Sequence, residues 1–241
     1  MYLTPEHLGH CSLFGGAPSE ASGERHSDLL SAQAAVGLNS RAPGQVFRFQ
    51  CATGCLPFPP FICHELLRAG VLRAYQLALN AARKLEAKPR TGLVVNAFHQ
   101  AFDHDPSLPL PWPGIRDSGM RFALRFRAVA QALQRAGTLY RCDSCTQIRE
   151  EPPDGSIIDA HAIAIPPNEV VLCPSFWRLP DALRAGVLLH EMFHLRFDPC
   201  FGHGPCERKR TSAYCYEAFA LSIAGHPPEQ LVIDRCGVLK Q

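Results

Sequence analysis

Residues 188–195 read LLHEMFHL, and this apolar stretch with its two histidines decides how the chain is interpreted. His190 and His194 are four positions apart, so on a helix both imidazoles lie on one face, about one turn apart. Glu191 lies beside them. This HExxH spacing on an apolar helix is typical of two imidazoles that bind one zinc ion next to a glutamate acting as general base. The alternative is a helix with two incidental histidines, in a chain that has 11 histidines among 241 residues.

Composition excludes several classes of partner. The chain has 24 Lys and Arg against 22 Asp and Glu, a formal net charge of +2, so we expect neither a nucleic acid nor an anionic membrane as partner. No stretch approaches the roughly twenty consecutive apolar residues that a spanning helix needs, and residues 1–11 lack the pattern of a signal peptide. We therefore expect a soluble protein without membrane insertion and without a classical signal peptide.

Eleven cysteines are many for a chain of this size and favour an oxidising compartment. We expect disulfides, including a short loop from Cys200 to Cys206. A structural zinc site is an alternative, because Cys142 and Cys145 form a CxxC and residues 51–63 hold three more cysteines. A redox-active CxxC is less favoured, since no βαβ pattern surrounds it. The location stays open between the cytoplasm and secretion or delivery by a specialised system.

The distribution of apolar residues predicts one domain behind a leader. Residues 1–45 are rich in Gly, Ser, Ala and Pro without periodicity, which indicates a flexible leader or linker before a domain at 46–241. Apolar residues at helical spacing predict helices in that domain, and β-rich or alternating stretches predict strands. Turn residues and a proline-dense loop at 103–117 separate these elements. Helices are expected at 64–87, 121–137, from about 180 through the HExxH, and 211–226, and strands at 138–142, 156–165 and 168–173.

Several segments together resemble the deuterolysin and peptidyl-Lys metalloendopeptidase family, the aspzincins. In that family an apolar strand ending in a Cys and an aromatic pair precedes the zinc helix, and residues 170–177, VVLCPSFW, are similar. Residues 140–145, YRCDSC, resemble its paired-cysteine segment, and residues 212–220 resemble its later NADSYxxFA helix. The likeness spans roughly residues 63–226. It implies an α+β, zincin-like domain, with helices packed on a small, mostly antiparallel sheet and the HExxH on a central active-site helix.

The third zinc ligand is open among three side chains. The resemblance implies an Asp, and Asp198 opens a stretch similar to the family's DxxYG. On a continued helix Asp198 would lie two turns past His190 and, at about 1.5 Å per residue, would overshoot the metal. His203 lies between two glycines with room to return, and three imidazoles leave a fourth position for water. We favour His203, with Asp198 next and Glu217 third, since a Glu on a following helix is a ligand in thermolysin-like enzymes.

The chemistry expected from these residues is hydrolysis of peptide bonds in a peptide or protein substrate. Zinc lowers the pKa of a bound water, and Glu191 takes the proton from that water as general base. A second electrophile usually stabilises the oxyanion. The family resemblance implies a Tyr in the DxxYG stretch, but Phe201 stands there. Tyr214 or Tyr216 is the candidate instead, although core packing is the alternative role for Tyr216.

Two further interpretations stay open. A catalytically inactive, zinc-stabilised binding module would explain the missing Tyr at position 201, but such a module does not need Glu191. A delivered effector or toxin, with its peptidase acting in a target cell or envelope, is compatible with the enzyme interpretation and is suggested by the leader and the cysteines. Cleavage specificity and any inhibitor or delivery partner cannot be read from the sequence.

Overall fold

The computed structural model describes residues 47–51, 57–109, 117–135, 137–145, 159–163, 168–197 and 210–226. All of them belong to one compact unit within residues 42–241. The predicted leader at 1–45 lies outside the described residues, as does the expected Cys200–Cys206 loop, so both stay predictions. Within the described residues, no helix is both long and apolar enough to cross a membrane.

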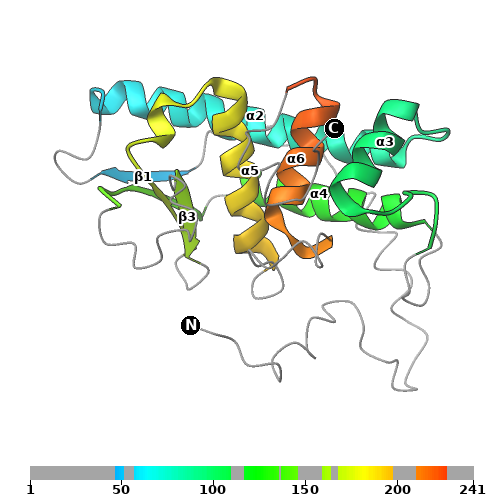
Figure 1. Ribbon diagram of the computed structural model, residues 1–241. Helices are drawn as coiled ribbons and strands as arrows, with labels where there is room; N and C mark the ends of the chain where they lie inside the picture. Colours follow the sequence, from blue (N-terminus) through cyan, green and yellow to red (C-terminus); the bar gives the residue numbers. More distant parts are fainter. Residues whose placement is uncertain are drawn as a thin grey trace, which may run out of the picture. The chain divides into compact units, whose positions relative to one another are not determined.

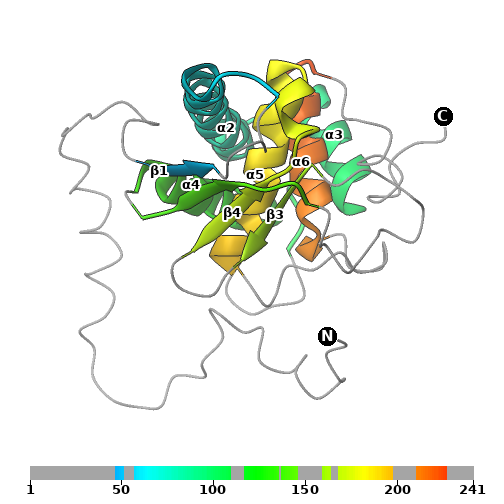
Figure 2. The ribbon, with the colours of Figure 1, turned by 90° about the vertical axis from the view of Figure 1, so that its left-hand side faces the viewer.

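Four short strands form one mixed sheet in the order β1-β2-β4-β3. The strands are β1 Arg48–Cys51, β2 Leu139–Cys142, β3 Ala160–Ile163 and β4 Glu169–Leu172. The pairs β1–β2 and β2–β4 are parallel, and only β3 runs antiparallel to its neighbour β4 (Figure 2). The predicted α+β class is confirmed, but the expectation of a mostly antiparallel sheet is wrong. Parallel pairing requires a long connection, and three helices lie between β1 and β2.

The described residues contain five α-helices, and these include the four that the apolar spacing predicted. They are α2 Pro60–Glu86, α3 Gly92–Phe102, α4 Ser118–Gln134, α5 Asp181–Phe197 and α6 Ala213–Ile223, with a short 3-10 helix η2 at Phe176–Arg178. Helix α3 and strand β1 were not predicted. The HExxH stretch lies in the second half of α5, and the last helical residue there is Phe197.

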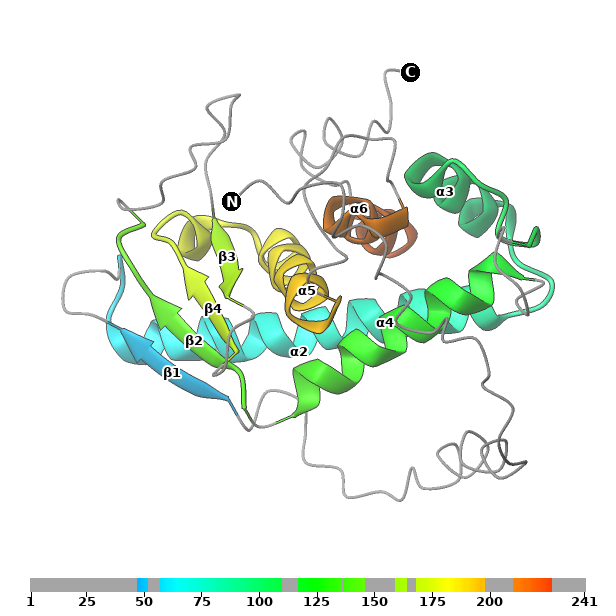
Figure 3. The ribbon, with the colours of Figure 1, turned by 90° about the horizontal axis from the view of Figure 1, so that it is seen from below.

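Helix α5 lies between the edge strand β3 and helix α6, and α3 packs on α6 from the other side (Figures 1 and 3). Helix α2 contacts α4, α5 and α6. The core between α3, α4, α5 and α6 contains an aromatic cluster, with neighbouring ring centroids 4.3–5.9 Å apart. Its rings are those of Phe98, Phe102, Phe122, Phe126, Phe193, Phe197, Tyr216 and Phe219. This packing fixes α6 against α5, the helix that carries the two histidines.

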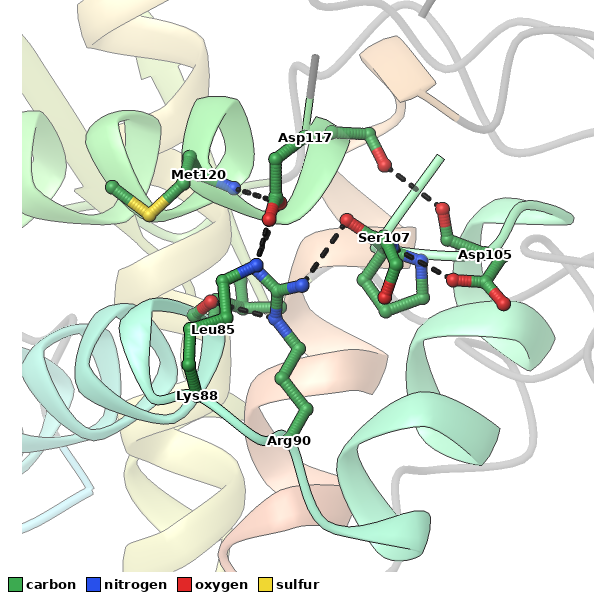
Figure 4. Close-up of polar contacts among 9 residues, drawn as sticks. Leu85, Lys88, Arg90, Asp105, Ser107, Asp117 and Met120 are labelled. Atoms are coloured by element: carbon green, nitrogen blue, oxygen red, sulfur yellow. Dashed lines mark hydrogen bonds and ion pairs between the residues drawn. The ribbon is translucent and has the colours of Figure 1, made fainter. Parts of the chain in front are cut away.

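A buried arginine ties the end of α2 to the start of α4 (Figure 4). The Arg90 side chain is 2% exposed, its Nε donates to the Leu85 carbonyl at 2.7 Å, and its Nη2 donates to Asp117 Oδ1 at 2.7 Å. Asp117 is also the N-cap of α4, because its carboxylate accepts from the Met120 amide at 3.1 Å. Lys88 pairs with the other Asp117 oxygen. Asp117 thus compensates the charge of Arg90. These contacts also join the end of α2 to the start of α4, so they hold together the two ends of the segment that contains α3.

Disulfides crosslink the sheet, in agreement with the expectation from cysteine content. Cys51 and Cys142 are opposite one another in the β1–β2 register and are bonded. Cys145 is bonded to Cys173, which directly follows β4. Cys215 on α6 is disulfide-bonded as well. The two cysteines of the CxxC therefore bond to different partners and not to each other.

Candidate metal centre

The two histidines of α5 direct the same ring nitrogen toward one point. His190 Nε2 and His194 Nε2 are 3.1 Å apart. A tetrahedral zinc ion with both nitrogens at its usual bond length holds them about 3.3 Å apart. His190 is buried at 5% exposure, and His194 is half-buried. The donors and their separation thus fit one zinc ion.

Glu217 on α6 contacts the other nitrogen of the same ring. Its Oε2 lies 3.2 Å from His190 Nδ1, and both side chains are almost completely buried. A carboxylate on Nδ1 favours the tautomer whose Nε2 carries the lone pair, the arrangement that commonly orients a metal-binding histidine. Because Glu217 occupies Nδ1 and the candidate metal position is at Nε2, this contact supports an orienting role more than the role of third ligand.

Glu191 is buried between α5 and the edge of the sheet. It is 5% exposed, and its carboxyl accepts a hydrogen bond from the backbone N–H of Ala162 on β3. Burial and then the nearby Glu217 carboxyl raise the pKa of Glu191 to about 8. Burial and then the Asp159 carboxyl also raise the pKa of Glu217. A divalent cation beside these carboxyls would offset both effects.

The electrostatics of His190 fit a metal ligand. Burial lowers its pKa to about 3, so the imidazole is neutral at physiological pH. A neutral imidazole is the form that binds zinc, since a protonated nitrogen has no lone pair to give.

The two candidate tyrosines have different surroundings. The Tyr214 ring is half-buried and lies 4.4 Å, centroid to centroid, from the His190 ring. Tyr216 is fully buried in the aromatic core, where its hydroxyl donates to the Arg210 carbonyl at 3.1 Å and also contacts Arg125 Nη1. The catalytic role predicted for Tyr216 stays a prediction, and these contacts favour core packing, the alternative for this residue.

The two leading candidates for third ligand, Asp198 and His203, lie outside the described residues. Asp198 could bind only if α5 ended immediately before it, and the described part of α5 runs to Phe197. Both candidates stay predictions.

A second group of ligand-type side chains lies at the end of the sheet, and the sequence did not point to it. Cys145, His161 and Cys173 bring one ligand atom each to within 4.8 Å of one another. In the sequence, His161 is one residue of a β-alternating stretch and is separated from both cysteines by more than ten positions. Only the pairing of β3 with β4 brings it to them, so no local pattern could have signalled the group.

No known family model matches the chain, and no curated protein is significantly similar to it. The likeness to aspzincins therefore rests on the short segments described above.

Proposed function

We propose that this protein is a zinc-dependent metalloendopeptidase with a zincin-like fold, related to the deuterolysin family. The observation that carries the proposal is the 3.1 Å separation of His190 Nε2 and His194 Nε2, with the buried Glu191 carboxyl next to them on the same helix. When bound, the zinc ion supplies Lewis-acid chemistry, acidifying water and polarising a carbonyl oxygen. A third ligand, His203 or Asp198, completes the set.

Each residue near the centre then has a distinct task. Glu191 accepts a proton from the attacking water and passes it to the leaving amine. The Ala162 N–H holds the Glu191 carboxyl in place. Glu217 orients His190 through Nδ1. Tyr214, whose ring lies against His190, is our candidate for the donor that stabilises the oxyanion.

The position of β3 supports a peptide substrate. β3 is the edge strand next to α5 (Figure 3). The Asp159 carbonyl accepts from the Cys173 amide at 2.9 Å. Because hydrogen-bonded and non-hydrogen-bonded pairs alternate in an antiparallel ladder, the backbone groups of His161 point toward β4, and those of Ala160 and Ala162 point outward. The Ala162 N–H is bonded to Glu191, but an extended peptide can add to the other outward backbone groups of such an edge by hydrogen bonds, which would bring its carbonyl groups near the candidate metal centre.

The second candidate is a zinc-stabilised binding module without catalysis. It is favoured by Phe201, which has no hydroxyl where the resemblance implies a Tyr. Delivery of the peptidase as an effector or toxin is a question of context and is compatible with the first proposal.

Mass-spectrometric profiling of a mixed peptide library tests the proposal. The library is incubated with zinc-loaded wild type, with Glu191→Gln, and with Glu65→Gln as a control that alters an exposed glutamate of α2. We expect cleavage by wild type and Glu65→Gln, and none by Glu191→Gln, although all three retain zinc. Cleavage by metal-replete Glu191→Gln would contradict the mechanism. Bound zinc without cleavage by wild type would favour the binding module.

A further inference from the structure

The Cys145–Cys173 disulfide lies against a histidine whose ring nitrogen has no partner. His161 Nδ1 is buried and has no hydrogen-bond partner among the described residues. A buried polar nitrogen without a partner is costly, and such a group commonly marks a site for a ligand or an ion. One nitrogen of the His161 ring and the sulfurs of Cys145 and Cys173 lie within 4.8 Å of one another.

We propose that Cys145, Cys173 and His161 form a second metal site. The site binds zinc or another ion that prefers thiolate ligands, and it becomes available when the Cys145–Cys173 disulfide is reduced. Two thiolates and one imidazole are a ligand set that zinc accepts, and solvent would fill the fourth position. This site is separate from the HExxH centre and does not depend on the proposed peptidase activity.

The geometry requires only small side-chain movements. In a tetrahedral site two zinc-bound sulfurs lie about 3.8 Å apart, so on reduction the sulfurs of Cys145 and Cys173 would move from bonding distance to that separation. The backbone around them is held by strand contacts: the Cys173 amide donates to the Asp159 carbonyl at 2.9 Å, and the Asp143 amide donates to the Leu172 carbonyl at 3.1 Å. His161 is paired with Val171 in the β3–β4 register. The three ligands are therefore preorganised by the sheet.

Among the described residues, the carboxylates that act electrostatically on His161 are already paired with an arginine. Arg141 forms ion pairs with both Asp143 and Glu169, so those carboxylates are already compensated. Cys145 and His161 are half-buried, so an ion and a small reductant can reach the group from solvent.

The reduction needs an external dithiol. The dithiol gives two electrons and two protons to the S–S bond, which breaks to leave two thiols, and the dithiol becomes its own disulfide. Both thiols then release their protons to solvent as the thiolates bind the ion. Disulfide and metal are thus two alternative crosslinks between the same residues.

Cobalt titration tests this proposal, because thiolate-to-cobalt charge transfer gives a near-ultraviolet band that nitrogen and oxygen ligands do not. The protein is a full-length His190→Ala/His194→Ala variant, which lacks the HExxH ligands. It is reduced with a phosphine, which is oxidised to the phosphine oxide with oxygen from water. We expect the band in the reduced protein and none in the oxidised protein.

Variants of the three ligands assign the band. Cys145→Ser/Cys173→Ser should lose it, and His161→Ala should lower the cobalt affinity at least about tenfold. His104→Ala is the matched control, because His104 is also half-buried with an unpartnered ring nitrogen among the described residues. It should bind cobalt as the parent does. An unchanged band in the double serine variant, or an unchanged affinity in His161→Ala, would overturn the proposal.

Alkylation of wild type gives a second readout if a variant fails to fold. In the reduced protein, zinc should protect Cys145 and Cys173 from iodoacetamide, as read by peptide mass spectrometry. Equal labelling of both cysteines with and without zinc would overturn the proposal. Peptide cleavage is not measured in either experiment, so loss of the peptidase proposal would leave these outcomes unaffected.

Discussion

Gly186 and Glu217 are in close contact across the α5–α6 interface. A Cβ atom at position 186 would lie 2.7 Å from Glu217 Oε1 and 3.0 Å from Leu221 Cδ1. Position 186 is one helical turn before His190, so its lack of a side chain gives the Glu217 carboxyl the room in which it contacts the imidazole.

Gly186→Ala should therefore weaken zinc binding without unfolding the protein. An alanine gains about 1 kcal/mol of helix propensity over glycine, which offsets part of the steric cost, whereas the displaced carboxyl no longer orients His190. We expect a loss of about tenfold in zinc affinity, measured by competition with a chromophoric chelator. Gly70→Ala is the matched control. Its Cβ would meet Leu188 Cδ1 at 2.9 Å, and its three nearest atoms belong to Leu188 and Arg184 and not to Glu217, so its zinc affinity should stay unchanged.

Glu217→Gln and Glu217→Ala distinguish an orienting residue from a zinc ligand. The amide oxygen of Gln can still accept from His190 Nδ1, so Glu217→Gln should lose less zinc affinity than Glu217→Ala, for which we expect a loss of about 10–100-fold. The measurement is zinc content and affinity at fixed pH. Complete loss of zinc from both variants would assign Glu217 as the third ligand.

The third ligand itself is tested by His203→Ala and Asp198→Ala. Because His203 lies between Gly202 and Gly204, it has room to return to the metal. We therefore expect His203→Ala to lose zinc more severely than Asp198→Ala. Metal content is measured by inductively coupled plasma mass spectrometry after dialysis against a weak chelator. If His203→Ala holds as much zinc as wild type, the ligand is Asp198 or Glu217.

Tyr214→Phe and Tyr216→Phe form a pair that separates catalysis from packing. If the Tyr214 hydroxyl stabilises the oxyanion, Tyr214→Phe should lower kcat about 100-fold with little change in stability. Tyr216→Phe removes a buried hydroxyl that donates to Arg210, so we expect about 1–2 kcal/mol less stability and normal kcat. Urea unfolding and peptide hydrolysis are measured on both. The reverse assignment of effects would move the catalytic role to Tyr216.

The parts of the site that the sequence predicted are those set by local geometry. The placement of His190, Glu191 and His194 follows from helical spacing alone, and the apolar residues around them predicted that helix. The Glu217–His190 contact spans 27 positions and depends on how α6 packs against α5. No periodicity encodes that distance, which is why Glu217 could be named as a candidate but its position on Nδ1 could not.

The missed elements lack the usual signals. Helix α3 is short, begins at Gly92 with no side-chain hydrogen bond from its N-cap Thr91, has no acidic residue in its first turn, and holds the β-branched pair Val94 and Val95. Those features weaken a helix prediction. Strand β1 has only four residues. The parallel pairing of β1 with β2 depends on a crossover through three helices, whereas strand prediction from alternation carries no information on direction.

The bond between Cys145 and Cys173 spans 28 positions and encloses both β3 and β4. A single protease cut between these cysteines would leave both fragments in one covalently joined molecule. Strand β3, whose Ala162 N–H bonds to Glu191, would keep its position after such a cut. It would stay paired with β4, and β4 continues along the chain into α5. Such a nicked protein would run as one band on a non-reducing gel and as two after reduction.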